Sequence, residues 1–256
     1  IPVSGGKDST WQTIKCLEHG LNPLTVTWRS PQRTKIGQEN LDNLISLGVD
    51  HIDWTVNPEI EKKLTLESYK KFGAIAIPMH LAMFNIPLLI ASHFRIPYVI
   101  WGENSAVEYG NFSKKDNQKI LSDKWYKNYG VTHNTKAKDW VSKNLPKKKM
   151  SSYFDYKSYE KKHYDPESIF LGYFFKWDPN ETYEISKKFG FKAGNTARTG
   201  FYKFADIDDY FISIHHWLKW YKFGFTRIFD NLSLEIRNNR ISREKAIKII
   251  RSNGLK

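Results

Sequence analysis

Apolar residues alternate between helical spacing and short β-branched runs along the first 112 positions. Helical spacing predicts helices over 9–19, 38–47, 58–72 and 81–94, and the β-branched runs predict strands over 24–28, 51–56 and 98–101. Residues 1–3 are expected to end a further strand. Strands that alternate with helices in this way predict an α/β fold with a doubly wound parallel sheet.

The pattern changes after residue 112. Residues 113–165 combine many lysines with scattered aromatic residues, which predicts a basic insertion that is partly helical and mobile. A further core strand is predicted over 168–175. From Asp178 onward the spacing is helical, with Ser242 as the N-cap of a last helix that ends at Gly254. We therefore predict an α/β domain over residues 1–180, with the insertion at about 113–165, and a mainly helical C-terminal region over 181–256.

Three segments directly follow predicted strands, namely 4–9, 27–31 and 102–110. Ligands of doubly wound sheets bind beyond the carboxyl ends of the strands. We therefore expect these segments to meet around one ligand site.

The first of these segments contains a glycine motif, Ser4-Gly5-Gly6-Lys7-Asp8-Ser9-Thr10. Two adjacent glycines allow a tight turn that presents backbone N–H groups to an anion, and the helix that follows adds the positive end of its dipole. Ser4, Ser9 and Thr10 offer hydroxyl donors. The Asp8 carboxylate does not favour phosphate by itself, so we expect a magnesium ion between it and bound phosphates. The spacing of a Walker loop is absent.

The run from Ser4 to Ser9 resembles the SGGxDS signature of the PP-loop ATP pyrophosphatases, which share an adenine nucleotide α-hydrolase-like fold. The resemblance implies that ATP is split between its α- and β-phosphates, with Asp8 and Lys7 as candidate catalytic residues and Asp8 as the magnesium ligand. The residues implied in ATP binding are Ser4, Gly5, Gly6, Lys7, Asp8, Ser9, Thr10, Thr27, Trp28 and Gly102.

Other parts of the chain resemble the N-acetyl sugar amidotransferases of lipopolysaccharide and O-antigen biosynthesis. The similar runs are 34–41, 102–110, 219–227, 236–237 and 241–244. The resemblance implies an enzyme that converts an acetamido group of a nucleotide-activated diacetamido sugar to an acetamidino group through an adenylated intermediate. It also implies that ammonia comes from a partner glutaminase with a cyclase-like channel protein.

Candidate substrate-binding residues are Glu103, Asn104, Glu108, Tyr109 and Arg227. The first four could be loop caps, but their place at the ligand edge of the sheet favours a functional role. Arg227 could equally form an ordinary salt bridge. A histidine pair at 215 and 216 is a further candidate for a base or a metal site. Neighbouring residues on a helix face different ways, which argues against joint metal ligation by the pair.

Lys and Arg number 40 against 27 Asp and Glu, a net charge of +13. Such a surface attracts polyanions. A general lysine bias of the proteome would produce the same charge without any functional role. The single cysteine, Cys16, excludes an internal disulfide and suits the cytoplasm. No apolar stretch is long enough to span a bilayer.

The cysteine-rich segment that precedes the glycine motif in the resembling family has no counterpart here. We therefore expect residues upstream of Ile1 and predict no zinc site.

Two alternatives stay open. A PP-loop tRNA-modifying enzyme would use the same adenylation on a base carbonyl and would bind RNA through the basic insertion. A non-catalytic binding module would hold nucleotide or RNA as a scaffold. The runs shared with the sugar enzymes favour the amidotransferase, for which we expect no stable binding of nucleic acid.

Overall fold

The computed structural model of the chain describes residues 1–102, 104–108, 118–158 and 164–252. Its strands pair in parallel, β1 (Leu24–Trp28) with β2 (Asp50–Trp54) and β3 (Tyr98–Trp101) with β4 (Glu167–Phe170). The N-terminal segment runs beside β1 and joins it through one parallel bridge, between Pro2 and Val26. Parallel pairing was predicted correctly. The described strands nevertheless form two separate pairs, where we had predicted one doubly wound sheet.

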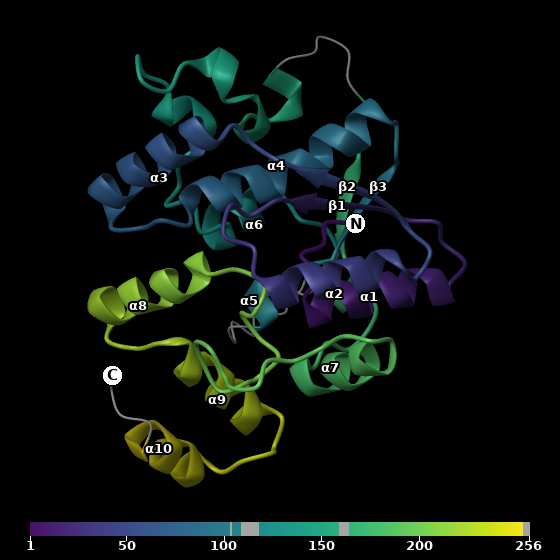
Figure 1. The fold of residues 1–256 in the computed structure, drawn as a ribbon, viewed down its shortest axis with the longest axis vertical. Coiled ribbons are helices and arrows are strands. Elements are labelled where there is room, and N and C mark those ends of the chain that lie inside the picture. Colours follow the sequence, from purple (N-terminus) through teal and green to yellow (C-terminus); the bar gives the residue numbers. More distant parts are fainter. Residues whose placement is uncertain (103, 109–117, 159–163, 253–256) are drawn as a thin grey trace.

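Helices lie on both sides of the strands, as Figure 1 shows. Helices α1 (Lys7–Glu18) and α2 (Lys35–Ile45) lie on one side, and α3 (Pro58–Phe72) and α4 (Ile77–His93) lie on the other. Helix α4 is apolar on all faces and packs against both β1 and β3. It therefore links the two strand pairs.

Local capping sets most of these boundaries. The predicted bounds of β1, α3 and β3 are correct. Asn57 accepts backbone hydrogen bonds at the start of α3, and Gly73 ends the helix in the left-handed conformation with φ 60°. Helix α4 starts at Ile77, before the predicted Leu81, because Pro78 fits the first turn of a helix. Helix α2 starts at Lys35 because Thr34 caps it.

The described part of the insertion shares its core with α4. It contains α6 (Asp123–Tyr129) and a series of short 3-10 turns between residues 137 and 158. Trp125 packs with Phe84 of α4, and Trp140 and Tyr153 belong to the main core cluster. The mobility of the insertion stays a prediction.

The described part of the chain after the insertion begins with a strand and continues mainly as helices. Strand β4 ends at Phe170, where residues 171–173 turn into a 3-10 helix, so the strand predicted over 168–175 was too long. Helices α7 (Pro179–Lys188) and α8 (Phe211–Phe223) are separated by a long loop, and α9 (Arg227–Arg237) and α10 (Arg243–Ser252) complete the region. Ser242 caps α10, as predicted, since its hydroxyl accepts the Lys245 N–H at 3.2 Å. Gly254 lies outside the described residues.

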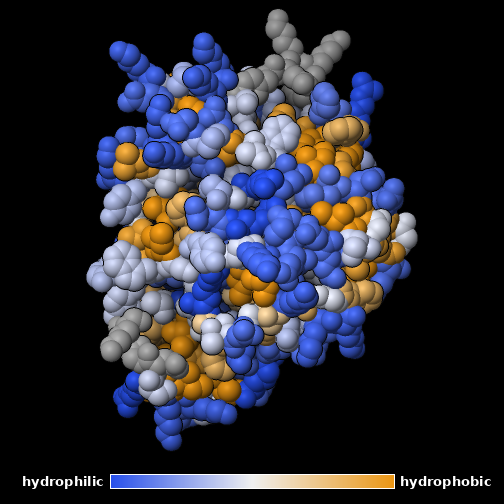
Figure 2. All heavy atoms as spheres, viewed as in Figure 1, coloured by the Kyte–Doolittle hydropathy of each residue, from blue (hydrophilic) through white to orange (hydrophobic). Residues whose placement is uncertain are grey.

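Hydrophilic side chains predominate on the face of the molecule in Figure 2, with smaller apolar groups between them. Among the residues that the structure describes, no helix combines the length and apolar character needed to cross a membrane.

Candidate active site

A cavity of about 370 Å³ lies where the three predicted segments meet. We call it the glycine-turn cavity. Ser4, Gly6, Asp8 and Ser9 line it from the glycine motif, Trp28 and Ser30 from the end of β1, and Gly102 and Ser105 from the end of β3. Its apolar lining includes Val26, Met83, Phe84 and Trp101. The convergence of strand ends on one cavity was therefore predicted correctly.

The glycine turn is held by close contact with α2. Gly5 has φ 85°, a left-handed conformation that favours glycine, and a Cβ built on it would lie 2.7 Å from the Leu41 nitrogen. Gly6 then caps α1, which begins at Lys7 and not at the predicted Ser9. The turn thus places the first N–H groups of α1 at the edge of the cavity, where an anion could bind.

The hydroxyl groups of the motif divide into two kinds. Ser9 and Thr10 both donate to the Gly6 carbonyl at 3.0 Å, and Thr10 is fully buried and does not line the cavity. Ser4 is exposed and lines the cavity. Thr27, also buried, donates to the Val3 carbonyl at 2.6 Å. Thr10 and Thr27 therefore stabilise the turn and the strand. Thr27 also lines the glycine-turn cavity, as Ser4 and Ser9 do, whereas Thr10 does not.

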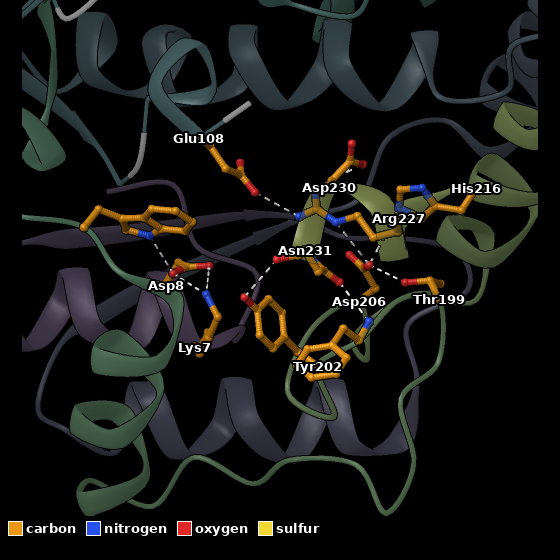
Figure 3. Close-up of polar contacts among 12 residues, drawn as sticks. Lys7, Asp8, Glu108, Thr199, Tyr202, Asp206, His216, Arg227, Asp230 and Asn231 are labelled. Atoms are coloured by element: carbon orange, nitrogen blue, oxygen red, sulfur yellow. Dashed lines mark hydrogen bonds and ion pairs between the residues drawn. The ribbon is translucent and has the colours of Figure 1, made fainter. Parts of the chain in front are cut away.

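Asp8 lies at the centre of a group of donors. Both of its carboxylate oxygens are 2.6 Å from Lys7 Nζ (Figure 3). Oδ1 also accepts from Trp177 Nε1 at 2.9 Å and from Thr182 Oγ1 at 3.1 Å. Ser186 donates to the Lys7 carbonyl at 2.7 Å. Helix α7 and the residues just before it therefore hold the first turn of α1 in place.

An acidic loop that the sequence analysis missed faces the glycine turn. Asp206, Asp208 and Asp209 all line the glycine-turn cavity. The Asp208 carbonyl accepts from the Thr34 N–H at 3.0 Å, and the Ile207 carbonyl accepts from the Thr34 hydroxyl at 2.6 Å. The loop is thus fixed to the start of α2. Three acidic residues within four positions were the available signal in the sequence.

Burial raises the pKa of Asp208 to about 6, and the charges of Asp206 and Asp209 add to this effect while a hydrogen bond from Ser4 opposes it. Asp206 has φ 56°, a left-handed conformation that is uncommon outside glycine. Its carboxylate accepts a hydrogen bond from the Thr199 hydroxyl. Strained, closely held polar residues of this kind concentrate at functional sites.

A second cavity of about 230 Å³ adjoins the first, and we call it the polar cavity. The two cavities share Ser4, Gly6, Asp8, Asp206 and Asp208 in their linings. The rest of the polar cavity is lined mainly by the C-terminal region. The glycine turn and the acidic loop therefore form a wall with a cavity on each side.

A buried ion-pair network spans the polar cavity. Arg227 Nη2 is 3.0 Å from Glu108 Oε1, and Arg227 Nε is 3.7 Å from Asp206 Oδ2 (Figure 3). Asp230 Oδ2 is 2.5 Å from Lys219 Nζ and 4.0 Å from Arg227 Nη1. The structure thus brings two predicted substrate residues, Glu108 and Arg227, into direct contact with each other.

The other residues predicted after β3 are placed differently. Asn104 is buried and accepts from Trp125 Nε1 at 2.8 Å. Gly102 accepts the Gly172 N–H at 3.0 Å and lines the glycine-turn cavity. Glu103 and Tyr109 lie outside the described residues.

The two histidines of α8 contact different surroundings. His216 Nε2 is 3.6 Å from Asp206 Oδ2, whereas His215 lines a third cavity beside α3. Burial lowers the pKa of His216 to about 4 and that of His215 to about 3. Both rings are therefore neutral near pH 7. The described residues contain no group of three or more His, Cys, Asp or Glu side chains that could hold a metal ion by themselves.

Comparison with known families adds one finding. Residues 167–255 match the model of the C-terminal domain of WbpG-like LPS biosynthesis proteins. This part of the chain is similar to an LPS biosynthesis protein. No curated protein matches the chain.

The WbpG-like segment includes Trp177, the acidic loop and Arg227, and so it forms one wall of both cavities. The glycine motif lines both cavities beside the acidic loop and lies outside the match. The match supports a role in polysaccharide biosynthesis, while the likeness of the glycine motif to PP-loop enzymes rests on its own residues.

Proposed function

We propose that this protein is an ATP-dependent amidotransferase that converts an acetamido group of a nucleotide-activated sugar to an acetamidino group, in lipopolysaccharide biosynthesis. The observation that carries the proposal is the shared wall. The glycine turn and the acidic loop line both a partly apolar cavity and a polar, charged one, so two substrates bound in these cavities would lie next to each other. The WbpG-like segment supplies the other half of that wall.

In this proposal ATP occupies the glycine-turn cavity. The adenine lies against the apolar side near Trp28 and Trp101, and the phosphates bind the N–H groups at the start of α1. Lys7 and Asp8 stand at that helix start. Asp8 lines both cavities, whereas Lys7 lines only the polar cavity, where its ammonium pairs with the Asp8 carboxylate.

Oxygen ligands around the cavity fit a magnesium ion. Magnesium is commonly held by one or two carboxylates together with substrate phosphates, and Asp8 and Asp208 both face the cavity. Once bound, the ion would supply neutralisation of charge on the leaving pyrophosphate.

The sugar occupies the polar cavity, with Glu108 and Arg227 near its polar groups. The acetamido oxygen attacks the α-phosphorus of ATP, the bond to the β-phosphate oxygen breaks, and pyrophosphate leaves, while the amide loses its N–H proton. The product is an O-adenylated imidate. Ammonia then adds to the imidate carbon. The bond from this carbon to the AMP oxygen breaks, AMP leaves with the electron pair, and one proton is released. The backbone N–H groups of the glycine turn stabilise the departing pyrophosphate.

The test is incubation of the protein with ATP, magnesium, ammonium chloride and a set of diacetamido nucleotide sugars. We expect AMP, pyrophosphate and a sugar with the mass of the amidine to form together. ATP consumption that depends on tRNA, with no amidine from any sugar, would instead favour a tRNA-modifying enzyme. Absence of any sugar- or ammonium-dependent release of pyrophosphate would reject the proposal.

A further inference from the structure

A third cavity, of about 230 Å³, lies between α3, the start of α4 and the start of α8. We call it the side cavity. The exposed residues Pro31, Gln32, Pro58 and Lys62 belong to its lining, so it opens to solvent. Trp28, Met79, Asp209 and Ile212 line both the side cavity and the glycine-turn cavity. The side cavity, which opens to solvent, therefore adjoins the proposed ATP site at these four residues.

The side cavity holds two carboxylates in a largely apolar lining. Glu61 is only 8% exposed, and Asp209 stands on the shared wall. The other lining residues include Ile75, Ala76, Pro78, Met79, Phe211 and Ile212. Two carboxylates that face one apolar space repel each other, and a small cation between them relieves that repulsion.

The lining of this space contains two carboxylates and one lysine, Lys62, and the guanidinium of Arg198 near Asp209 acts to lower the pKa of that carboxyl. Burial raises the pKa of Glu61 to about 7, and the charge of Asp209 adds to the effect. His215, on the opposite side, is neutral because burial lowers its pKa to about 3. Lys62 is exposed at the rim. Glu61 is therefore a better proton acceptor than an ordinary carboxylate.

We propose that the side cavity is the port through which ammonium enters, loses a proton and reaches the glycine-turn cavity as ammonia. Glu61 and Asp209 bind the ammonium ion. One N–H bond of the ion breaks, its proton goes to a Glu61 carboxylate oxygen, and the nitrogen keeps the electron pair that later attacks the imidate carbon. The proton then leaves Glu61 for solvent. This inference rests on the proposed function, because only a reaction that consumes ammonia needs such a port.

The test uses ammonium chloride as the only nitrogen source and two variants of residues that line the side cavity but not the glycine-turn cavity. Glu61→Gln removes the proton acceptor, and Thr65→Trp fills the space. We expect the KM for ammonium to rise about tenfold in Glu61→Gln, since a charge-assisted contact is lost. The KM values for ATP and for the sugar should stay at the wild-type level.

Two controls keep the result specific. Glu61→Asp retains a carboxylate and should restore part of the ammonium affinity. Leu66→Trp adds the same indole at the neighbouring position of α3, where the side chain is 50% exposed and does not line the cavity, and should behave as wild type. Ammonium-independent exchange of pyrophosphate into ATP, measured with the sugar present, shows that each variant is folded and adenylates normally.

An unchanged KM for ammonium in active Glu61→Gln and Thr65→Trp proteins would reject the port and leave the proposed function standing. If wild-type protein forms no amidine at any ammonium concentration, the proposed function and the port fall together. If only Thr65→Trp fails to fold, the comparison of Glu61→Gln with Glu61→Asp decides.

Discussion

At the scale of single residues, the environment of Asp8 gives it two tasks. Its carboxylate faces the glycine-turn cavity and also accepts hydrogen bonds from Lys7, Trp177 and Thr182. The contacts with Trp177 and Thr182 tie α1 to the α7 region. Substitutions around Asp8 can therefore separate the chemical task from the structural one.

We predict that Asp8→Asn lowers ATP-dependent release of pyrophosphate by on the order of 100-fold or more, because it removes the negative charge without changing side-chain shape. Thr182→Val serves as the matched control, since it removes one donor to Asp8 and keeps the carboxylate. It should retain most activity. Circular dichroism would show that both variants are folded, and normal turnover by a folded Asp8→Asn protein would contradict the assignment.

Burial of Glu61 predicts a pH-dependent stability. Its pKa is raised from 4.5 to about 7, so the folded state binds more protons than the unfolded state between these values and stability falls as pH rises through them. Glu61→Gln, which has no charge to bury, should gain stability over wild type on going from pH 5 to pH 8, by about 3 kcal/mol at most.

Urea unfolding at the two pH values measures this difference. Glu59→Gln is the matched control because Glu59 is exposed on the same helix. Its stability relative to wild type should not change over this pH range. An equal pH response of the Glu61→Gln protein and wild type would show that the buried carboxylate does not titrate in this way.

At the scale of secondary-structure elements, the contact between α2 and the acidic loop orients both proposed binding cavities. The loop carries Asp206, Asp208 and Asp209 to the glycine turn, and Thr34 at the N-cap of α2 holds the loop by two hydrogen bonds. Gly37, one turn into α2, allows the backbone of the loop to approach. A Cβ there would lie 2.7 Å from the Asp208 Cα atom and carbonyl oxygen.

We predict that Gly37→Ala destabilises the protein by about 2 kcal/mol, although alanine normally favours a helix over glycine. The added methyl group would displace the acidic loop, so the KM for ATP should rise as well. Lys35→Ala at the exposed start of the same helix is the control and should change neither quantity. Thermal unfolding and initial-rate kinetics provide the two readouts. A Gly37→Ala protein as stable as wild type would show that the acidic loop moves to admit the methyl group at little cost in free energy.

At the scale of the whole molecule, two chain regions far apart in sequence build the site together. The glycine motif forms one side of the wall between the cavities, and the WbpG-like segment forms the other.

The single cysteine does not line either cavity. Cys16 is buried within α1, and burial raises the pKa of its thiol. Such a thiol is a poor nucleophile.

We predict that the purified chain uses ammonium but not glutamine as its nitrogen source. Cys16→Ser should leave ammonium-dependent turnover within about twofold of wild type, because a reactive cysteine is accessible and has a low pKa, and this one has neither property. Amidine formation with glutamine alone, lost in Cys16→Ser, would contradict this prediction, because it would show that Cys16 releases ammonia from glutamine. If the purified chain uses ammonium and not glutamine, a partner glutaminase is the expected source of ammonia.

The sequence by itself determined the local elements and the glycine turn. The span of α3 follows from Asn57 and Gly73 at its two ends, and the tight turn at the start of α1 follows from two glycines before a helix. These features depend on interactions between residues a few positions apart, which a sequence pattern records directly. The sequence also predicted which strand ends meet, because parallel strands direct their carboxyl ends to one edge.

Only the tertiary structure decided what surrounds the glycine turn. Trp177 and Asp8 are 169 residues apart, and Arg227 and Glu108 are 119 residues apart, yet each pair is joined by a hydrogen bond. The position of the acidic loop and the side cavity with Glu61 likewise depend on contacts between segments far apart in the sequence. Apolar periodicity shows which face of a helix is buried but not which partner covers it, so the pairing of distant residues required the packed molecule.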